Sequence, residues 1–502
     1  MKLLLIALAA GALSAFAFQP VGLWILMPLA LALLCELIWR SKSLKQALGL
    51  GWGFGLGQFV VGLNWIATAF TYQAKMPAWL GWVAVVLLSL YLAIYPALAT
   101  GLAWRYGRQS PQRLIFVFAG AWAVTEWLRG TMFTGFPWNP LGVTLVDTPI
   151  LSIATLIGTY GLSALVAWVA GTLWLLTKKR WIPLTATIVG TLIAAIVSPM
   201  FALPRSDGAG PIRVVQPNIG QEVKWSPGFS DEAARRLAAL SLKPGGERPR
   251  LLFWPEAAVT NPLEDARILE QPYAQFERQR AATTIGPNEY LLTGGLAVFS
   301  RDGRRIEGAA NSIYVLGQSG RVLGRYDKAH LVPYGEYLPM RPVLSAIGLS
   351  RLAPGDFDFN DGPGPRTIDI PGWGKAGFQL CYEIIFSGEV VDRRNRPDFI
   401  FNPSNDAWFG RWGPPQHLAQ ARLRAAEEGL PVIRSTPTGI SSVIDAHGRV
   451  LNSVPWNRAG VIDAILPSPT TPTPFARLGN LIPLLLGFAL LIGGIAVGRT
   501  RR

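Results

Sequence analysis

Long apolar segments fill the first part of the chain and recur once near its end. Seven precede Leu203, at residues 3–18, 21–39, 47–67, 78–104, 114–131, 150–177 and 181–201, and an eighth spans residues 478–498. Most of them reach the roughly 20 residues with which an α-helix crosses the hydrocarbon core of a bilayer. We therefore expect eight transmembrane helices, and we divide the chain into a membrane domain (1–202), an extramembrane domain (203–477) and an eighth helix with a basic tail (478–502).

The first apolar segment also fits a second interpretation. Lys2 precedes the apolar run and Ala15-Phe16-Ala17 closes it, and these are the parts of a secretory signal peptide that is cleaved from the mature protein. Cleavage would leave the arrangement of the later segments unchanged.

Basic residues gather in alternate loops between the apolar segments. They are Arg40, Lys42 and Lys45 after the second segment, Arg105, Arg108 and Arg113 around the end of the fourth, Lys178, Lys179 and Arg180 after the sixth, and Arg499, Arg501 and Arg502 after the eighth. The other loops carry little positive charge, with Lys75 as the exception. Because loops rich in Lys and Arg stay in the cytoplasm, we expect both termini there and residues 203–477 on the opposite side of the membrane.

Small and polar residues mark two places in the membrane domain. The alternating glycines Gly49 to Gly57 favour close packing of helices. Glu126 lies inside an apolar segment, where a carboxylate needs a partner, and Arg129 is one helical turn away. The stretch TGFPWNPLG at residues 134–142 is typical of a turn at the membrane interface. It either lines an entrance for lipid or is an ordinary interfacial loop.

Strand-like runs and helical patterns alternate in residues 203–477. The strand-like runs cover residues 212–218, 250–259, 289–299, 311–317, 376–383, 398–406 and 431–451, and the helical patterns cover 231–242 and 417–430. Such alternation predicts an α/β domain. Asp302-Gly303, Ser319-Gly320 and His447-Gly448 have the composition of hairpin turns, so we expect mixed sheets.

Charge and cysteine usage exclude several classes of function. The net charge is +15, but the basic residues form no dense tract and lie largely beside apolar segments, which indicates lipid headgroups and not nucleic acid as the partner. Cys35 and Cys381 lie far apart in different surroundings, so they form no disulfide framework. His330, His417 and His447 are scattered, and no Cys/His cluster has the spacing of metal ligands. We expect neither a metal nor a cofactor.

Three polar residues follow apolar strand-like runs. Glu256 follows LLFWP, Lys328 lies in GRYDKAHLVPYGEY, and Cys381 follows GFQL. Taken singly they also fit a solvated carboxylate, a surface lysine and a small buried hydrophobic residue. Together they supply a base, a cation and a thiol. A carboxylate can deprotonate a thiol, and an ammonium lowers the thiol pKa and stabilises the oxyanion that forms when the thiolate attacks a carbonyl.

The chain order of these motifs resembles a known superfamily. WPE, then YDKAHLVPYGEY, then CYE, then NPSNDAWFG is similar to the carbon–nitrogen hydrolase (nitrilase) superfamily with its Glu-Lys-Cys triad. Eight apolar segments around that domain, with EWLRG and TGFPW in and after the fifth, narrow the resemblance to the apolipoprotein N-acyltransferase family. It spans essentially the whole chain. It implies an α/β fold, a nitrilase-like α-β-β-α sandwich inserted between transmembrane helices seven and eight of an eight-helix bundle.

The resemblance also implies roles for individual residues. Glu256 is then the general base, Lys328 the electrostatic stabiliser and Cys381 the nucleophile. Glu336 in VPYGEY and Glu383 just after the cysteine have supporting roles, in which they orient the triad or balance its charge.

Aromatic residues complete the expected site. Trp225 and Tyr382 fall where the acyltransferases carry residues near the lipid or at the mouth of the site. Trp408, Phe409 and Trp412 in DAWFGRWG form a cluster that we expect to be exposed, so that it shields the site or enters the bilayer. Packing in the protein core is the alternative for this cluster.

The activity that the resemblance implies is acyl transfer in two steps. The Cys381 thiolate attacks an ester of a phospholipid, which leaves a thioester on the enzyme and releases a lysophospholipid. The α-amine of the N-terminal diacylglyceryl-cysteine of an apolipoprotein then takes the acyl chain, in the last step of lipoprotein maturation. Ping-pong kinetics follow from the covalent intermediate. The enzyme is then a monomer of the bacterial inner membrane with its catalytic domain in the periplasm.

Two other functions fit part of the sequence. A membrane-anchored amidase or nitrilase acting on a small soluble substrate needs the triad but gives no reason for eight membrane segments. A transporter with an accessory domain explains the segments, but they hold few ionisable residues beyond Glu36 and Glu126, whereas ion and substrate pathways usually require them.

Overall fold

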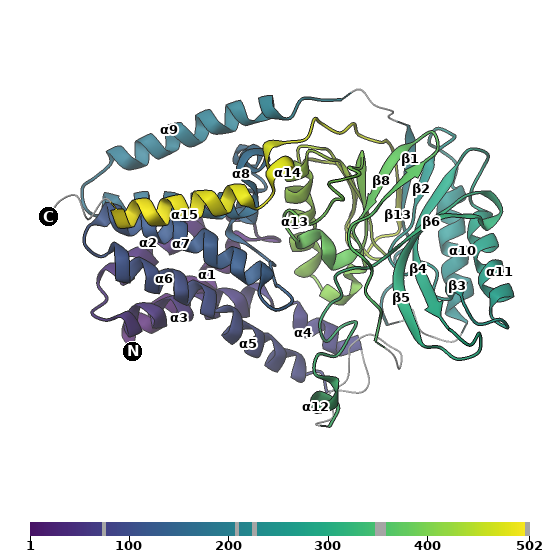
Figure 1. The fold of residues 1–502 in the computed structure, drawn as a ribbon, viewed down its shortest axis with the longest axis horizontal. Coiled ribbons are helices and arrows are strands. Elements are labelled where there is room, and N and C mark those ends of the chain that lie inside the picture. Colours follow the sequence, from purple (N-terminus) through teal and green to yellow (C-terminus); the bar gives the residue numbers. More distant parts are fainter. Residues whose placement is uncertain (73–76, 206–209, 223–227, 347–357, 497–502) are drawn as a thin grey trace.

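Helices from both ends of the chain form one half of the molecule, and two β-sheets with their covering helices form the other (Figure 1). The computed structural model describes residues 1–72, 77–205, 210–222, 228–346 and 358–496. We call the two parts the membrane half and the sheet half.

The membrane half contains an α-helix at each of the eight apolar segments. Its helices are α1 (Lys2–Ser14), α2 (Leu26–Trp39), α3 (Leu44–Gly62), α4 (Ile66–Ala69), α5 (Leu80–Leu92), α6 (Ile94–Gly107), α7 (Pro111–Thr131), α8 (Ala154–Leu176), α9 (Ile182–Val197) and α15 (Leu481–Ala496). Short 3₁₀ turns lie between or beside them: η1 (Ala15–Ala17), η2 (Phe70–Tyr72), η3 (Leu141–Leu145), η4 (Pro149–Ile153) and η5 (Ser198–Phe201).

Only some of these helices have both the length and the apolar composition of a membrane span. Among the described residues, three helices are long and apolar enough to cross a membrane, Leu80–Gly107, Pro149–Leu176 and Ile182–Phe201. The pair α3 and α4, bent by 47°, makes a fourth if it counts as one span. Lys2–Ala17, Leu26–Trp39 and Leu481–Ala496 are apolar but shorter, and about 15 helical residues rise only about 22 Å. The predicted segments are therefore confirmed as helices, but eight full crossings are not.

Glycines on α3 let three helices approach closely, as predicted. Gly51 and Gly55 lie against α6, and Gly53 and Gly57 lie against α1. A Cβ atom at Gly51 or at Gly57 would come within 2.1 Å of a neighbouring atom, so no larger residue fits without a shift of the helices. Gly49 has nothing within 4 Å and takes no part in this packing.

The last two membrane segments differ in how they pack. α15 returns to the bundle and lies on α7, where a Cβ at Gly120 would come within 2.5 Å of the Gly487 carbonyl oxygen. α9 has no fully buried residue: it contacts α8, where the Trp168 Nε1 donates to the Thr187 hydroxyl at 3.0 Å, and its Ile188, Leu192 and Ile196 side chains are exposed. A helix whose apolar side chains are largely uncovered by protein is suited to a lipid environment.

Two mixed sheets form the sheet half. The first has the order β13-β1-β2-β4-β5-β6, with β3 paired to β4, and its strands are β1 (Pro211–Gln216), β2 (Leu251–Phe253), β3 (Pro262–Asp265), β4 (Tyr290–Phe299), β5 (Gly308–Leu316), β6 (Val322–Asp327) and β13 (Gly460–Ile465). The second has the order β12-β11-β10-β9-β8-β7, and its strands are β7 (Thr367–Ile370), β8 (Gly374–Phe378), β9 (Phe399–Pro403), β10 (Val432–Ser435), β11 (Ser441–Ile444) and β12 (Val450–Val454). The three predicted hairpins join β4 to β5, β5 to β6 and β11 to β12.

The sheets pack face to face and helices cover their outer faces. Rings from both sheets meet in the core, with the centroids of Phe253 and Phe401 5.1 Å apart. On the first sheet lie α10 (Phe229–Leu242) and α11 (Gln271–Ala282), and on the second lies α13 (Gly413–Glu428) (Figure 1). The other elements are α12 (Arg341–Ala346), α14 (Pro474–Leu478), η6 (Gln318–Gly320), η7 (Cys381–Ile385) and η8 (Asp406–Phe409). This is the predicted α-β-β-α arrangement.

Several strand predictions were wrong in their limits. The run 250–259 forms only β2, because Pro255 lacks an N–H for the ladder and Ala257 turns the chain with φ at +45°. The run 376–383 ends as a strand at Phe378, and 431–451 is divided among three strands. The prediction missed β3, β6, β7, β13 and α11, several of which are short or partly exposed elements with weak apolar periodicity.

α13 lies between the second sheet and the membrane helices. Ala421 and Ala425 belong to the apolar cluster that contains Val432 of the second sheet. Leu423 and Ala426 belong to the cluster of the membrane helices. The two halves therefore share the apolar side chains of this helix.

A buried carboxylate also joins the halves. α8 breaks at Gly158, whose φ is +62° and whose conformation is not helical. Glu427 of α13 accepts hydrogen bonds from the Thr159 backbone N–H at 2.5 Å and from the Thr159 hydroxyl at 2.7 Å, and it pairs with Arg424 at 2.9 Å. A carboxylate is favourable at a helix N-terminus, so Glu427 caps the part of α8 that begins at Thr159.

Candidate active site

The ends of three strands bring Glu256, Lys328 and Cys381 to one edge of the sandwich. Glu256 follows β2 and Lys328 follows β6, which run in the same direction in the first sheet. Cys381 follows β8 of the second sheet and begins the turn η7. The three residues are only 7%, 1% and 6% exposed, in that order. A solvated carboxylate at Glu256 and a surface lysine at Lys328 are therefore excluded.

A chain of hydrogen bonds joins Glu256 to Lys328. The Asn311 Nδ2 donates to Glu256 Oε1 at 2.8 Å and to Glu336 Oε1 at 3.2 Å. The Lys328 Nζ donates to Glu336 Oε1 at 2.8 Å. The second Glu336 oxygen accepts from the Val332 backbone N–H at 2.9 Å. The result is a buried network with two carboxylates around one ammonium.

The charges of this network act on the cysteine. Burial raises the pKa of the Cys381 thiol well above its ordinary value, and the Glu256 carboxylate raises it further. The Lys328 ammonium and the Asn405 backbone N–H oppose this rise. Burial lowers the pKa of Lys328, but the carboxylates of Glu336 and Glu256 outweigh burial and leave it above its ordinary value. The ammonium therefore stays charged, and the thiol keeps its proton until a base takes it.

Glu383 links the two loops that carry Lys328 and Cys381. Its Oε1 accepts from the Tyr326 hydroxyl at 2.8 Å and from the backbone N–H groups of Ala329 at 2.7 Å and His330 at 2.9 Å. Its Oε2 accepts from the Leu380 backbone N–H at 2.6 Å. Three of these four hydrogen bonds come from backbone N–H groups of the two loops, so the Glu383 carboxylate holds the loops together.

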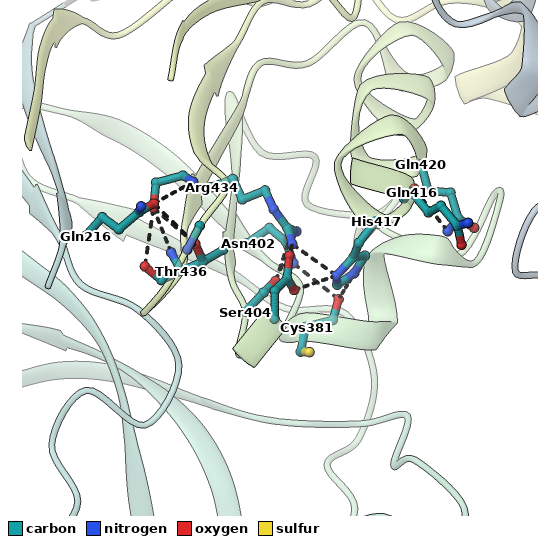
Figure 2. A network of polar contacts seen from close by, with 12 residues as sticks. Gln216, Cys381, Asn402, Ser404, Gln416, His417, Gln420, Arg434 and Thr436 are labelled. Atoms are coloured by element: carbon teal, nitrogen blue, oxygen red, sulfur yellow. Dashed lines mark hydrogen bonds and ion pairs between the residues drawn. The ribbon is translucent and has the colours of Figure 1, made fainter. Parts of the chain in front are cut away.

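The backbone of Cys381 is in a conformation that few residues other than glycine adopt, with φ at +53°. The His417 Nε2 lies 3.1 Å from the Cys381 carbonyl oxygen, and the Asn402 Nδ2 lies 3.4 Å from it. Figure 2 shows these side chains gathered on the carbonyl, with Arg434 behind them. The cysteine is therefore held through its main chain as well as through the turn.

Cys381, Asp406 and His417 have ligand atoms within 4.8 Å of one another, which is a spacing that metal sites also show. Cys, Asp and His are all possible zinc ligands. However, the Arg434 guanidinium forms an ion pair with Asp406 and lies 3.0 Å from His417 Nδ1. A permanent cation on two of the three groups repels a metal ion, so we assign no metal here.

The aromatic residues of DAWFGRWG are less exposed than predicted. Trp408, Phe409 and Trp412 are half-buried, not exposed. Phe409 packs on Trp65 with ring centroids 4.6 Å apart, and Trp412 packs on Phe16 at 6.0 Å. These partners come from the membrane half, so the cluster seals the junction of the two halves. Position in the sequence did not reveal these partners, because they lie more than 300 residues away.

The two other aromatic residues have different outcomes. Trp225 lies outside the described residues. Tyr382 is buried, and its hydroxyl donates to the Gly135 carbonyl at 3.3 Å. Its ring packs on Phe386 at 5.3 Å and on Phe136 at 6.4 Å. The residue after Cys381 thus contacts the TGFPWNPLG loop of the membrane half directly.

That loop is held by the predicted partners Glu126 and Arg129. An Arg129 nitrogen lies 3.8 Å from a Glu126 oxygen, and both residues are buried. The Arg129 Nη1 donates to the carbonyls of Phe136 and Trp138 at 2.7 and 2.8 Å. The ion pair therefore fixes the loop on which Tyr382 rests.

Sequence reasoning missed Asn311 and Arg434 and gave His417 no role. Asn311 stands in the strand-like run NSIYVLG, and an amide beside a run of apolar residues was a usable signal. Arg434 stands in PVIRST, where a cation inside a buried strand was a similar signal. His417 opens a helical pattern, and a lone histidine there had no such signal.

Comparisons with known proteins cover both halves. The family model described as apolipoprotein N-acyltransferase N-terminal domain matches residues 10–172, and the model described as carbon-nitrogen hydrolase matches residues 212–473. A protein of Rhodopseudomonas palustris named apolipoprotein N-acyltransferase is 36% identical over 506 residues, which cover 96% of this chain and 92% of that protein. A protein of Bradyrhizobium diazoefficiens with the same name is 37% identical over 515 residues, which cover 98% and 94%.

Among solved structures, a carbon–nitrogen hydrolase from Helicobacter pylori is similar with a TM-score of 0.37 and 16% identity, covering 51% of this chain and 89% of its own. The full-length relatives carry the assignment, because they match the membrane half and the sheet half together. The chain belongs to the apolipoprotein N-acyltransferase family, and it is an acyltransferase whose catalytic domain has the nitrilase-like fold.

Proposed function

We propose that the enzyme transfers an acyl chain from a phospholipid to the α-amine of the N-terminal diacylglyceryl-cysteine of apolipoproteins, through a thioester on Cys381. The observation that carries the proposal is the placement of the cysteine. Cys381 is buried near enough to Glu256 and Lys328 for both charges to act on its thiol, and the next residue, Tyr382, contacts a loop of the membrane half. Both substrates are held in the membrane, so a nucleophile at this junction is within their reach.

The first step forms the acyl-enzyme. Glu256 takes the proton of the Cys381 thiol, and the sulfur attacks the ester carbonyl carbon of the phospholipid. Lys328 stabilises the negative charge that develops on the carbonyl oxygen. The bond between that carbon and the glycerol oxygen breaks, and the oxygen receives the proton from Glu256. A thioester remains and a lysophospholipid leaves.

The second step transfers the acyl chain. The α-amine of the apolipoprotein attacks the thioester carbon, the carbon–sulfur bond breaks, and the thiolate returns. Glu256 takes a proton from the attacking nitrogen and passes it to the sulfur. Each substrate reacts in its own half-reaction, so the two need not be bound together. Glu336 keeps Lys328 in place in both steps through the bond at 2.8 Å.

The membrane topology and the remaining site residues are part of the same proposal. The alternation of basic loops supports eight crossings of a bacterial inner membrane, cytoplasmic termini and a periplasmic catalytic domain. The limits 1–202, 203–477 and 478–502 follow from that topology. Trp225, Trp408 and Phe409 are proposed to lie near the lipid path, and the enzyme is proposed to act as a monomer without a cofactor.

Intact-mass measurement of the acyl-enzyme tests the proposal. Incubation of the purified enzyme with phospholipid vesicles is expected to add the mass of one acyl chain to the wild type and to Cys35→Ala, and nothing to Cys381→Ala. Cys35 is a matched control because it is also a buried free cysteine. Neutral hydroxylamine is expected to remove the added mass, because it cleaves thioesters.

A chase with a diacylated lipopeptide completes the test. The added mass is expected to leave the enzyme and appear on the peptide amine. An amidase would show no phospholipid-derived adduct, and a transporter would keep its activity in Cys381→Ala. A wild-type enzyme that never gains the acyl mass would contradict the proposal.

A further inference from the structure

The buried cluster behind Cys381 has no part in the two chemical steps. It consists of His417, Asp406 and Arg434, which are all 0% exposed. On the basis of the proposed role of Cys381 as nucleophile, we infer that His417 is a positioning residue whose Nε2–H holds the Cys381 carbonyl and so aims the thiol at Glu256 and Lys328.

The bond to the carbonyl decides where the imidazole proton lies. A carbonyl oxygen only accepts hydrogen bonds, so the His417 Nε2, 3.1 Å away, must carry a hydrogen to bond it. The Asn402 Nδ2 is a weaker second donor, because it lies at 3.4 Å and also donates to the Gln379 carbonyl at 2.6 Å. His417 is therefore the main donor to the Cys381 carbonyl.

The other ring nitrogen faces two charged groups. The His417 Nδ1 lies 2.9 Å from an Asp406 carboxylate oxygen and 3.0 Å from an Arg434 nitrogen. Burial and the Arg434 cation lower the pKa of His417 below its ordinary value. The imidazole is therefore neutral, with its hydrogen on Nε2 and with Nδ1 accepting from Arg434. Burial raises the pKa of Asp406, but the pKa is nevertheless below its ordinary value, chiefly because of the Arg434 cation, and the carboxylate is ionised.

This arrangement differs from a Cys-His-Asp triad, although the three residue types are present. In such a triad the imidazole bonds the thiol and takes its proton. Here the Nε2 bonds the Cys381 carbonyl at 3.1 Å, whereas the Cys381 sulfur, although within 4.8 Å of a ring nitrogen, points away from the ring in Figure 2. Because Glu256 is the proposed base for the thiol, the inference requires no proton transfer by His417.

The bond instead supports the unusual backbone. Cys381 has φ at +53°, a conformation that costs a residue other than glycine about 1–3 kcal/mol and persists only when its surroundings impose it. Without a donor on its carbonyl, the turn can relax and move the sulfur. A misplacement of about 1 Å at a reacting atom lowers rates by about 10²-fold.

Two substitutions of His417 separate positioning from other roles. His417→Gln keeps an N–H close to the place of the Nε2–H, whereas His417→Leu removes it. We expect His417→Leu to lower kcat for acyl-enzyme formation by about 10²-fold with little change in KM, and to slow alkylation of Cys381 by iodoacetamide. His417→Gln is expected to recover most of both rates, with the pH profile of alkylation unmoved.

Ser404→Ala is the matched control. Ser404 accepts from Arg434 at 3.0 Å within the same cluster but does not bond Cys381, so near wild-type rates are expected. Wild-type rates in His417→Leu would overturn the inference. So would His417→Gln as slow as His417→Leu with a lost acidic limb in its pH profile, because the imidazole would then transfer a proton.

Two further results have their own interpretation: a His417→Leu variant that does not fold, and a wild-type enzyme that gains no acyl mass. If His417→Leu does not fold, the rate and pH profile of His417→Gln alone decide. A wild-type enzyme that gains no acyl mass would contradict the proposed function, whereas the alkylation rates would still report on the positioning of Cys381.

Discussion

The two sides of the Cys381 turn are both buried and both charged, yet they act on different parts of the cysteine. On one side, which we call the reactive side, Glu256, Asn311, Lys328 and Glu336 place two carboxylates around one ammonium. On the other, the supporting side, Asp406 is balanced by Arg434, and His417 is neutral.

The difference shows how a protein can bury many ionisable groups and use only some as acids or bases. On the reactive side the Glu256 carboxylate and the Lys328 ammonium both act on the pKa of the Cys381 thiol, so the charges there bear on the reacting sulfur. On the supporting side each charge has its partner and the free hydrogen-bond donor faces a main-chain carbonyl. What each group touches, and not its residue type, separates the two sides.

The largest expected effect comes from removing Glu256, the proposed base on the reactive side. Glu256→Gln is expected to slow acyl-enzyme formation by about 10²–10⁴-fold. Because the Glu256 carboxylate raises the pKa of the Cys381 thiol, its loss lowers that pKa, so alkylation by iodoacetamide moves to lower pH while catalysis falls. Parallel acyl-mass and alkylation profiles measure both. An alkylation profile that moves to higher pH would contradict the assignment.

Lys328→Met removes the cation of the reactive side, and the expected pH shift is opposite to that of Glu256→Gln. The ammonium lowers the thiol pKa, so its loss raises that pKa and moves alkylation to higher pH. Acyl-enzyme formation is expected to fall by about 10²–10³-fold, since the developing oxyanion loses its cation. Lys375→Met is the control, because Lys375 is exposed on the strand that leads to Cys381. Equal pH shifts in both variants would argue against a specific effect of Lys328.

Glu383 links the loops that carry Lys328 and Cys381, and its substitution tests how much stability and activity depend on that link. Glu383→Gln replaces one of two accepting oxygens by a donor, so at least one buried N–H loses its partner, which costs about 1–3 kcal/mol. We expect a lower midpoint of urea unfolding and slower acyl-enzyme formation. Tyr326→Phe removes only one of the four hydrogen bonds and is expected to lose about 1 kcal/mol. Equal losses in the two variants would mean that the backbone bonds contribute little.

The smallest expected effect comes from Gly294, which lies against the backbone of Glu256 and Ala257. A Cβ at Gly294 would lie 2.5 Å from the Ala257 nitrogen and 2.7 Å from the Glu256 Cα. Gly294→Ala therefore moves the backbone that carries the base, and we expect acyl transfer to slow by about tenfold. Gly295→Ala is the control, because its Cβ meets only side-chain atoms of Leu263 and Tyr314. A larger loss in Gly295→Ala would contradict this account.

Much of the reactive side could be predicted from the sequence, and little of the supporting side could. Glu256 and Cys381 follow apolar runs, and the order of the motifs indicated Lys328 together with them. His417 and Arg434 lie within a helix and a strand, and only the pairing of those elements brings them to Cys381. The packing of Phe409 on Trp65 could not be predicted either, because it also depends on how distant parts of the chain meet.

The membrane half shows the same limit in another form. The apolar segment at residues 21–39 has the length of a span, but its helix begins only at Leu26. Hydropathy counts apolar residues, whereas the length of a helix depends on where its hydrogen bonds begin. Fold class was predictable, because alternation of strands and helices is a local pattern.

The cap that Glu427 places on α8 has a consequence for biogenesis. Glu427, the carboxylate partner of Thr159, lies 268 residues later in the chain, so the cap forms only after those residues have been synthesised. α15, which packs on α7, is synthesised later still. The helices that precede α13 therefore cannot reach their final packing until α13 and α15 have both been synthesised.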